Sequence, residues 1–158
     1  MGIFNLFGKK EKQALKGYFS LQISNIEKLN SKAVRVEFDI PSSLESKFKF
    51  EPGQYINIVL NIDGKEQRRS YSICSHPNES LSIAIKRVEN GVVSNWFNDL
   101  TDYKDPVLVS APTGNFVLPK KAKSFVAIAA GSGITPIMSI LKAKAQENEG
   151  VLIYGNKT

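Results

Sequence analysis

Residues 69–75 read Arg69-Ser70-Tyr71-Ser72-Ile73-Cys74-Ser75 and place a guanidinium, a phenol ring and three small hydroxyl groups within seven positions. Successive side chains of an extended chain point to opposite faces, so Arg69 and Tyr71 would share one face and Ser70 and Ser72 the other. Arginine pairs with phosphate, tyrosine offers a ring face, and serine donates or accepts hydrogen bonds. The stretch indicates either a polar strand end or, with a bend after Tyr71, a site for a flat anionic ligand.

On both sides of this stretch, apolar and polar residues alternate in the way that is typical of half-buried strands. Val34, Val36 and Phe38 alternate with charged residues, and a later alternating run ends at the hairpin signal Asp63-Gly64. The expected strands span 18–28, 34–40, 56–62, 66–72, 81–85 and 107–110, with one short helix over 92–100. Short strands separated by turns predict a mainly β fold, a six-stranded antiparallel barrel over residues 18–119.

Residues 124–158 follow a different pattern. A continuous apolar run, 125–130, leads into Gly131-Ser132-Gly133-Ile134-Thr135-Pro136, then into a helical pattern and a second apolar strand over 151–154. This order predicts a βαβ unit with Pro136 at the first helical position. One such unit is too small to cover both faces of a parallel sheet. We therefore expect residues 124–158 to be the first part of an incomplete nucleotide-binding domain, open to self-association through its bare strands.

Composition excludes several classes of function. The net charge of +6 favours anionic ligands, but the lysines are scattered, so nucleic-acid binding is not expected. Cys74 is the only cysteine, which leaves no intrachain disulfide and no thiolate set for zinc or an iron–sulfur cluster, and we expect no metal site. The only histidine, His76, precedes a proline and is expected to be exposed rather than catalytic.

The N-terminal residues 1–17 combine a short apolar piece with a lysine-rich run, and are expected to form a frayed leader or a short amphipathic helix. No apolar run approaches the roughly 20 residues of a membrane span, and no signal peptide is visible. The expected location is the cytoplasm.

Two helix starts preceded by glycine could each hold a phosphate. Glycines allow backbone amides to approach an anion, and the positive end of the helix dipole favours negative charge. The segment 131–136 follows a buried strand, where ligands of α/β sheets bind, although a plain strand–helix turn explains it equally well. The segment Asn90-Gly91-Val92-Val93-Ser94 is either a second phosphate site or a simple helix cap.

Taken in order, these motifs resemble the ferredoxin–NADP reductase superfamily from about residue 18 to residue 158. Arg69-Ser70-Tyr71-Ser72 is similar to its flavin signature Arg-x-Tyr-Ser, and 86–94 to its pyrophosphate-binding strand and helix start. Residues 111–116 are similar to the run that closes its barrel, and 129–136 with 154–156 to the start of its nicotinamide-nucleotide domain. The amino-acid sequence of residues 69–75 most resembles that of the reductase components of bacterial oxygenases, the phenylacetyl-CoA epoxidase reductases among them.

The resemblance implies FAD and NAD(P)H as cofactors and assigns roles to matching residues. Arg69 would neutralise the FAD pyrophosphate and Tyr71 would flank the isoalloxazine. Ser72, near the flavin N5, and Thr135, near the nicotinamide, would be the catalytic residues. The full set expected to bind cofactors is Arg69, Ser70, Tyr71, Ser72, Ile85, Lys86, Gly91, Val92, Val93, Ser94, Gly131, Ser132, Gly133, Ile134, Thr135, Pro136 and Tyr154.

The implied function is that of an NAD(P)H-dependent flavoprotein reductase, in which electrons pass from NAD(P)H to FAD and then singly to an iron–sulfur centre and an oxygenase component. The 2Fe–2S cluster is expected only in a C-terminal part that this sequence lacks, or in a separate ferredoxin. Lys157 stands where relatives often carry arginine, which leaves the choice between NADH and NADPH open. The alternatives are a cluster-free flavin or haem-protein reductase and a non-catalytic nucleotide-binding regulatory module.

Overall fold

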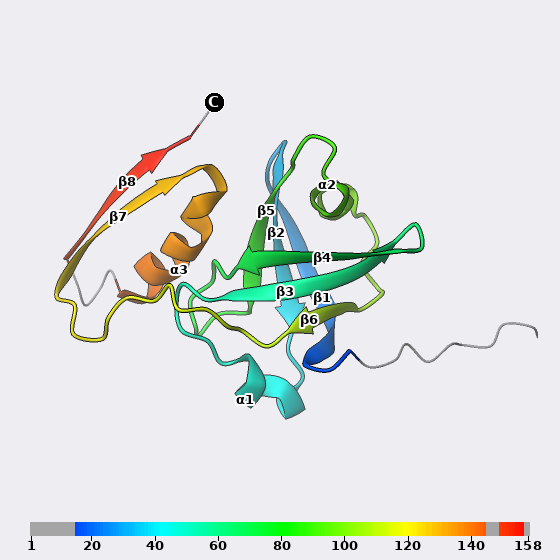
Figure 1. Ribbon diagram of the computed structural model, residues 1–158, viewed down its shortest axis with the longest axis horizontal. Helices are drawn as coiled ribbons and strands as arrows, with labels where there is room; N and C mark the ends of the chain where they lie inside the picture. Colours follow the sequence, from blue (N-terminus) through cyan, green and yellow to red (C-terminus); the bar gives the residue numbers. More distant parts are fainter. Residues whose placement is uncertain (1–14, 145–148, 157–158) are drawn as a thin grey trace, which may run out of the picture.

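A computed structural model describes residues 15–144 and 149–156 of the 158-residue chain (Figure 1). Most of the expected leader, the expected end of the last helix over 145–148, and Lys157 lie outside the described residues. The strands and helices are β1 (Tyr18–Asn30), β2 (Ala33–Asp39), α1 (Glu45–Phe48), β3 (Tyr55–Ile62), β4 (Lys65–Ser72), β5 (Ser82–Lys86), α2 (Val92–Asp99), β6 (Val107–Ser110), β7 (Ser124–Ala130), α3 (Ile134–Lys144) and β8 (Glu149–Gly155).

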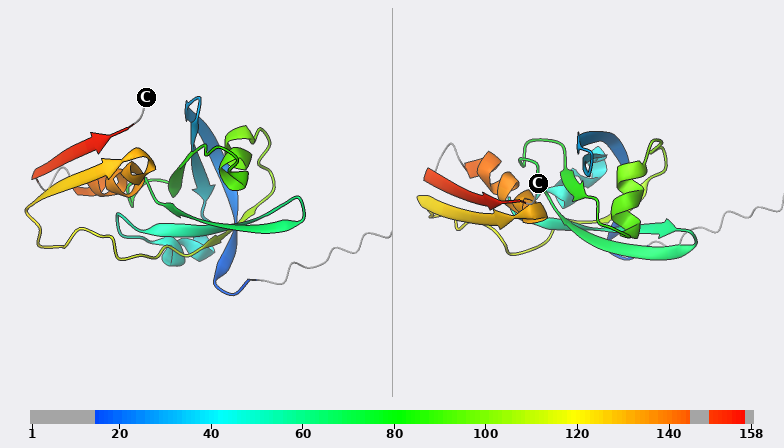
Figure 2. Two further views of the ribbon diagram at one scale, coloured as in Figure 1. Left: turned by 45° about the horizontal axis from the view of Figure 1, so that its top comes forward. Right: turned by 90° about the horizontal axis from the view of Figure 1, so that it is seen from above.

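The first six strands form one antiparallel sheet in the order β4-β3-β6-β1-β2-β5. The sheet curls until the chain beyond β4 meets β5, where Ile73 and Ile83 form an isolated bridge. Figures 1 and 2 show the resulting barrel, with α2 toward the turn end of the β3–β4 hairpin. The predicted six-stranded antiparallel barrel is confirmed.

The barrel core follows the alternation in the sequence. Val34, Val36 and Phe38 of β2 are buried, while the residues between them are half-buried. Phe97 of α2 is also fully buried, so this helix closes the core on one side. Each such side chain contributes about 1.5–3 kcal/mol of transfer free energy to folding. This burial makes the barrel the more stable part of the molecule.

A tight crossing joins the barrel to the segment that leaves it. Gly53 has φ +100°, and a Cβ atom there would lie 1.9 Å from the carbonyl oxygen of Phe116. The amides and carbonyls of Tyr55 and Thr113 pair reciprocally at 2.9 Å. The expected barrel-closing run 111–116 therefore lies against the start of β3, and only glycine fits at position 53.

Strands β7 and β8 form a separate parallel sheet, with Ala127 aligned with Leu152. Helix α3 covers one face, where Ala127, Ala129 and Ile137 are buried together. On the other face Ile128 is 75% exposed. The predicted βαβ unit is confirmed, but among the described residues only β7 has a buried face, and every residue of β8 is exposed.

The start of α3 differs from the sequence-based prediction. Gly131–Gly133 form a short 3-10 turn, and α3 begins at Ile134. Pro136 is consequently the third residue of the helix and not the first. A proline is tolerated there, because the first amides of a helix have no intrahelical acceptor and proline lacks only that donor. None of the described helices combines the length and apolar composition needed to cross a membrane.

Candidate functional site

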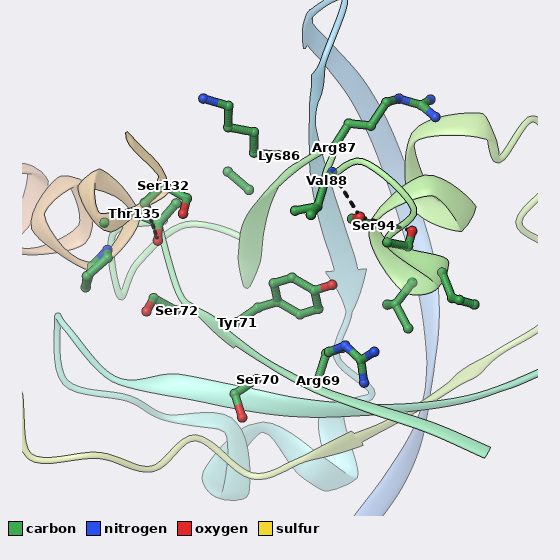
Figure 3. Close-up of a pocket in the computed structure, with 16 residues that line it drawn as sticks. Arg69, Ser70, Tyr71, Ser72, Lys86, Arg87, Val88, Ser94, Ser132 and Thr135 are labelled. Carbon is green, nitrogen blue, oxygen red and sulfur yellow. Dashed lines mark hydrogen bonds between the residues drawn. The ribbon is translucent and has the colours of Figure 1, made fainter. Parts of the chain in front are cut away.

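A groove of about 770 Å³ lies where the barrel meets the βαβ unit (Figure 3). One wall comes from β4, a second from β5 and the start of α2, and a third from the turn that opens α3. The residues that line it are Arg69, Ser70, Tyr71, Ser72, Ala84, Lys86, Arg87, Val88, Gly91, Val92, Val93, Ser94, Ser132, Gly133, Thr135 and Pro136. The structure thus brings together residues that the sequence places in three separate motifs.

The groove carries positive charge that the described residues do not neutralise. Arg69 is exposed and donates from Nη1 to the Arg68 carbonyl at 2.7 Å; no carboxylate among the described residues pairs with it. Lys86, on the opposite wall, lies 3.5 Å from the Asn156 side-chain oxygen. Arg87 differs, since its guanidinium pairs with Asp99 at 2.5 Å. Arg69 and Lys86 are therefore the cations available to an anionic ligand.

Arg87 has a structural partner as well as a place beside the groove. Its Nη1 also donates to Asn95 of α2 at 3.2 Å. The bond and charge of Arg87 lower the pKa of the Asp99 carboxyl, which lies at the end of the same helix. Arg87 therefore ties α2 to the end of β5 and brings little free charge to the groove.

Tyr71 is held as a neutral ring at the groove wall. Its ring meets Phe97 edge-on, with centroids 6.3 Å apart and planes at 86°. Burial raises the pKa of its hydroxyl to about 12, although the charge of Arg69 opposes this. The phenol is consequently protonated at neutral pH, and its ring is positioned to contact a flat ligand.

The two serines of β4 are used differently. Ser70 donates to Asn57 Oδ1 of β3 at 2.6 Å, and the Asn57 amide in turn donates to Ser110, so the Ser70 hydroxyl is already bonded and points away from the Tyr71 ring (Figure 3). The Ser72 hydroxyl has no hydrogen-bond partner among the described residues, and Ser72 lines the same groove as Thr135. Of the two, Ser72 has a free hydroxyl for a ligand.

The start of α2 has the geometry of an anion-binding helix end. Gly91 precedes the helix, and a Cβ atom there would lie 2.5 Å from Ser94 Oγ. The Ser94 hydroxyl accepts from the Val88 amide and donates to the Gly91 carbonyl, both at 3.2 Å, so it is used within the turn. The first amides of α2 have no intrahelical acceptor and remain available to a ligand beside them.

The turn that opens α3 is held by two hydroxyl groups. Thr135 Oγ1 donates to the Ser132 carbonyl at 3.0 Å, and the Tyr154 hydroxyl donates to the Gly131 carbonyl at 3.0 Å. Gly131 adopts φ +53°, in the left-handed region. Tyr154 and Gly131 thus shape the turn from outside the groove lining, while Thr135 lies within it.

Two other expected binding residues also lie away from the groove. Ile85 is 1% exposed and faces the barrel core, while its neighbours Ala84 and Lys86 line the groove. Ile134 packs against the β7 side of the βαβ unit. Ala84, Arg87 and Val88 were not among the expected binding residues. The alternation around Ile85 could have identified Ala84, because the neighbours of a core-facing strand residue face outwards.

Cys74 and His76 do not line the groove. The Cys74 thiol is buried 3.5 Å from both the carbonyl and the hydroxyl of Ser82, and burial raises its pKa. His76 is half-buried rather than exposed, and its Nδ1 accepts from the Asn78 amide at 2.9 Å within a turn. Over residues 15–144 and 149–156, no three potential metal-ligating side chains come together.

Comparison with known proteins places this geometry in a family. The sequence profile of the oxidoreductase FAD-binding domain family matches residues 20–118. One of the subunits of 1,2-phenylacetyl-CoA epoxidase from Escherichia coli K12 is 35% identical over 148 residues, which cover 89% of this chain and 42% of that protein. The chain spans about two fifths of the length of the curated relatives that it matches.

Solved structures agree with the sequence comparison. The structure of phthalate dioxygenase reductase, described as modular for electron transfer from pyridine nucleotides to [2Fe–2S], is 32% identical with a TM-score of 0.75, over 90% of this chain and 44% of that one. A ferredoxin–NADP reductase from Neisseria gonorrhoeae with bound FAD and NADP shares the fold, with a TM-score of 0.73 at 23% identity, over 87% of this chain and 57% of that one. The predicted resemblance to the ferredoxin–NADP reductase superfamily and its oxygenase reductases is confirmed.

Proposed function

The chain belongs to the oxidoreductase FAD-binding domain family, and from that premise we propose that its groove binds FAD and receives a nicotinamide nucleotide, as part of an NAD(P)H-dependent electron-transfer reductase. In this proposal residues 18–119 are the FAD-binding barrel, and residues 124–158 are part of an NAD(P)-binding domain.

The main support for this proposal is that three separate motifs line one groove. A single groove is lined by the Arg69–Ser72 stretch, by the Gly91–Ser94 helix start and by the turn that opens α3. Two of these elements offer groups for phosphate, and the third meets them at the same place. A ligand with an aromatic ring system and a pyrophosphate would find a partner for each of its parts here.

The residues present fit FAD. Arg69 has an unpaired charge for a phosphate, the first amides of α2 lie next to Gly91, and Tyr71 presents a neutral ring. A side chain at position 91 would collide with Ser94 Oγ, so glycine keeps this helix start open. We propose that these three groups hold the pyrophosphate and the flavin ring. Bound FAD would supply redox chemistry that no amino-acid side chain offers.

The third wall supports a nicotinamide nucleotide. The turn 131–133 offers exposed backbone beside the groove, and Thr135 lies in the lining with Ser72. We propose that this turn holds the nucleotide phosphates, and that Ser72 and Thr135 orient the two reacting rings. Closing the groove on its ligands would also exclude water from the space between them.

For the whole protein we propose an iron–sulfur domain or ferredoxin as the electron acceptor and an oxygenase component as its partner, in the cytoplasm where NAD(P)H is available. We further propose that the exposed face of the β7–β8 sheet associates with a second copy of the chain. The relatives at 35% and 32% identity support the first of these proposals, because one belongs to an epoxidase and the other is an oxygenase reductase.

Flavin titration tests the proposal directly. We expect the chain to bind FAD more tightly than FMN, since the groove has phosphate-binding groups on two walls. Arg69→Ala should weaken FAD binding by about 1.5–3 kcal/mol, the scale of a charge-assisted hydrogen bond. Fluorescence quenching of FAD by the parent and by the variant measures both effects, and bleaching of the bound flavin by NADH or NADPH tests the redox step.

Arg68→Ala is the matched control, because Arg68 is the neighbouring arginine but pairs with Glu66 and does not line the groove. FAD affinity should be unchanged in this control. Equal FAD affinity in Arg69→Ala and the parent would reject the assigned site. Bound FAD that neither nucleotide bleaches would favour a regulatory nucleotide-binding module over a reductase.

A further inference from the structure

One face of α3 is fastened to the chain that follows β4. The Ser139 hydroxyl donates to the Ser75 carbonyl at 2.7 Å. Ser139 is 0% exposed and Ser75 is 1% exposed. This is a buried hydrogen bond between residues 64 positions apart, and it joins the βαβ unit to the barrel. A hydroxyl in so dry a place has a single orientation, because no water can replace its acceptor.

A second contact lies one turn further along the same helix. Lys142 Nζ lies 2.7 Å from Glu79 Oε2, and the same carboxylate oxygen accepts from the His76 amide at 3.1 Å. The Lys142 and Glu79 side chains are 31% and 50% exposed, so this ion pair is a weaker tie than the buried hydrogen bond. Both contacts join α3 to the same short segment of the barrel.

The spacing relates these contacts to the groove. Thr135, Ser139 and Lys142 follow each other at four and three residues, so they share one face of α3. The barrel residues that Ser139 and Lys142 contact, Ser75 and Glu79, follow Ser72 along the chain in the same order. Thr135 and Ser72 both line the groove. The Ser139 contact lies about 6 Å along the helix from Thr135, so a rigid helix held at Ser139 also fixes where Thr135 lies.

We infer that Ser139, assisted by Lys142, is a positioning residue that sets the place of Thr135 relative to Ser72 across the groove. The inference rests on the proposed function of the groove, since it assigns a consequence for nucleotide and flavin rings that meet there. Removal of the Ser139 hydroxyl would leave the Ser75 carbonyl without this donor in a site that excludes water. Helix α3 would then be held to the barrel less firmly, through the Lys142–Glu79 ion pair and Ile140 near Gly53, while the FAD-binding wall stays intact.

Hydrogen exchange of the chain without cofactor is the first test. In Ser139→Ala we expect the amides of α3 to exchange about ten-fold faster, on the scale of one lost buried hydrogen bond. Ser124→Ala is the control, because Ser124 is an exposed serine of the same βαβ unit. Unchanged exchange of α3 in Ser139→Ala would overturn the inference, whatever the chain does with nucleotides.

Stopped-flow reduction of the FAD-loaded chain is the second test. Ser139→Ala should keep its FAD affinity within about two-fold, and should lower the rate of flavin reduction at saturating NAD(P)H about ten-fold. Lys142→Glu should have a smaller effect, and Lys142→Glu combined with Glu79→Lys should restore the rate in part, because the ion pair is rebuilt but an ammonium cannot accept from the His76 amide. Faster exchange of α3 with an unchanged reduction rate would show a purely structural contact and reject the positioning role.

A parent chain that binds FAD but is never reduced would count against the proposed function. The exchange result would still decide whether Ser139 holds α3.

Discussion

The barrel and the βαβ unit are both built from strands rich in isoleucine and valine, yet these side chains are buried in the barrel and largely exposed in the βαβ unit. Ile58 in β3 is 0% exposed, whereas Ile128 in β7 is 75% exposed. The curled sheet encloses its own core, with α2 and α1 closing its sides. In the β7–β8 sheet only β7 has a buried face, which α3 covers, and every residue of β8 is exposed. Apolar strands therefore do not by themselves make a core, because a second layer must cover each apolar face.

The difference between the barrel and the βαβ unit extends to the walls of the groove. Two of its walls belong to the barrel and the third belongs to a unit with a small core, so the barrel walls and the third wall should differ in local stability. The barrel walls should keep their geometry when the third wall moves. Changes that act on one region and spare the other test this difference.

The largest effect is expected at the crossing that both regions share. Gly53→Ala would put a methyl group 1.9 Å from the Phe116 carbonyl and 3.2 Å from Ile140 of α3, at a positive φ. We expect a loss of at least about 3 kcal/mol in the free energy of unfolding, with both regions loosened. Denaturant unfolding measures the loss. Gly64→Ala is the control, since Gly64 also has positive φ but open space around it, and should cost about 1 kcal/mol.

The same substitution in the two regions should have unequal costs. Ile58→Ala removes a fully buried side chain and should cost about 2–5 kcal/mol. Ile128→Ala removes a side chain that is 75% exposed, and should change the free energy of unfolding by less than about 0.5 kcal/mol. Thermal and denaturant unfolding of the two variants compare them. Similar costs would mean that the bare face of β7 is covered in solution.

The exposed face should govern self-association. Val126, Ile128, Val151 and Ile153 are all more than half exposed and lie on neighbouring parallel strands. A charge in this face, as in Ile128→Lys, should weaken self-association about ten-fold or more, because it would have to be desolvated in the interface. Sedimentation of the chain over a range of concentrations measures this. Leu29→Lys, at an exposed residue of β1, should leave association unchanged.

Replacement of the only cysteine should have a modest effect confined to the barrel. Cys74 is buried beside Ser82, and its thiol has a raised pKa, so it is not a reactive thiolate. Cys74→Ala should cost roughly 1 kcal/mol of stability and leave FAD affinity and nucleotide-dependent reduction within a few-fold. Titration and steady-state assays of the variant check this. Loss of reduction with FAD still bound would show that the thiol has a direct role.

The smallest effect concerns the ion pair between the two regions. Lys142 and a backbone bond from His76 lower the pKa of Glu79 from the usual 4.5. A lowered folded pKa means that the stabilisation is complete above about pH 4.5 and is lost as pH falls through the folded value. Since the pair is largely exposed, it contributes about 0.2–1 kcal/mol. Glu79→Gln should therefore be slightly less stable than the parent at pH 7 and equal to it in strong acid, as thermal unfolding at both pH values would show.

The barrel could be predicted from the sequence because the alternation of apolar and polar residues in each strand indicates which side chains face the core. Val34, Val36 and Phe38 alternate with polar residues, and the same residues are buried in the structure. The order of the motifs also identified the elements that meet at the groove. The predicted set of binding residues contained Ile85, whose side chain is fully buried in the barrel core. It did not contain Ala84, which lines the groove because the neighbours of a core-facing strand residue point outwards.

Features set by distant contacts could not be predicted. The 3-10 turn before α3 moved the helix start to Ile134, since a local pattern does not distinguish a helix from a tighter turn that leads into it. The contact of Ser139 with Ser75 joins residues 64 positions apart and has no local signal at all. The apolar strand 125–130 resembles a strand buried on both faces, although the number of layers around a strand is a property of the whole fold.

Strand β6 has only four residues, Val107–Ser110, but it lies between β3 and β1 in the sheet. Without it, β3 and β4 form one ladder and β1, β2 and β5 form another, and the two meet only at the bridge between Ile73 and Ile83. On the ribosome these two ladders would emerge before β6, which cannot pair with β3 and β1 until residue 110 has left the exit tunnel. Pairing distant segments is slow compared with forming hairpins, so the joining of the two halves by β6 should set the pace of folding. A weakened β6 would then prolong the time in which two open sheet edges are exposed to other nascent chains.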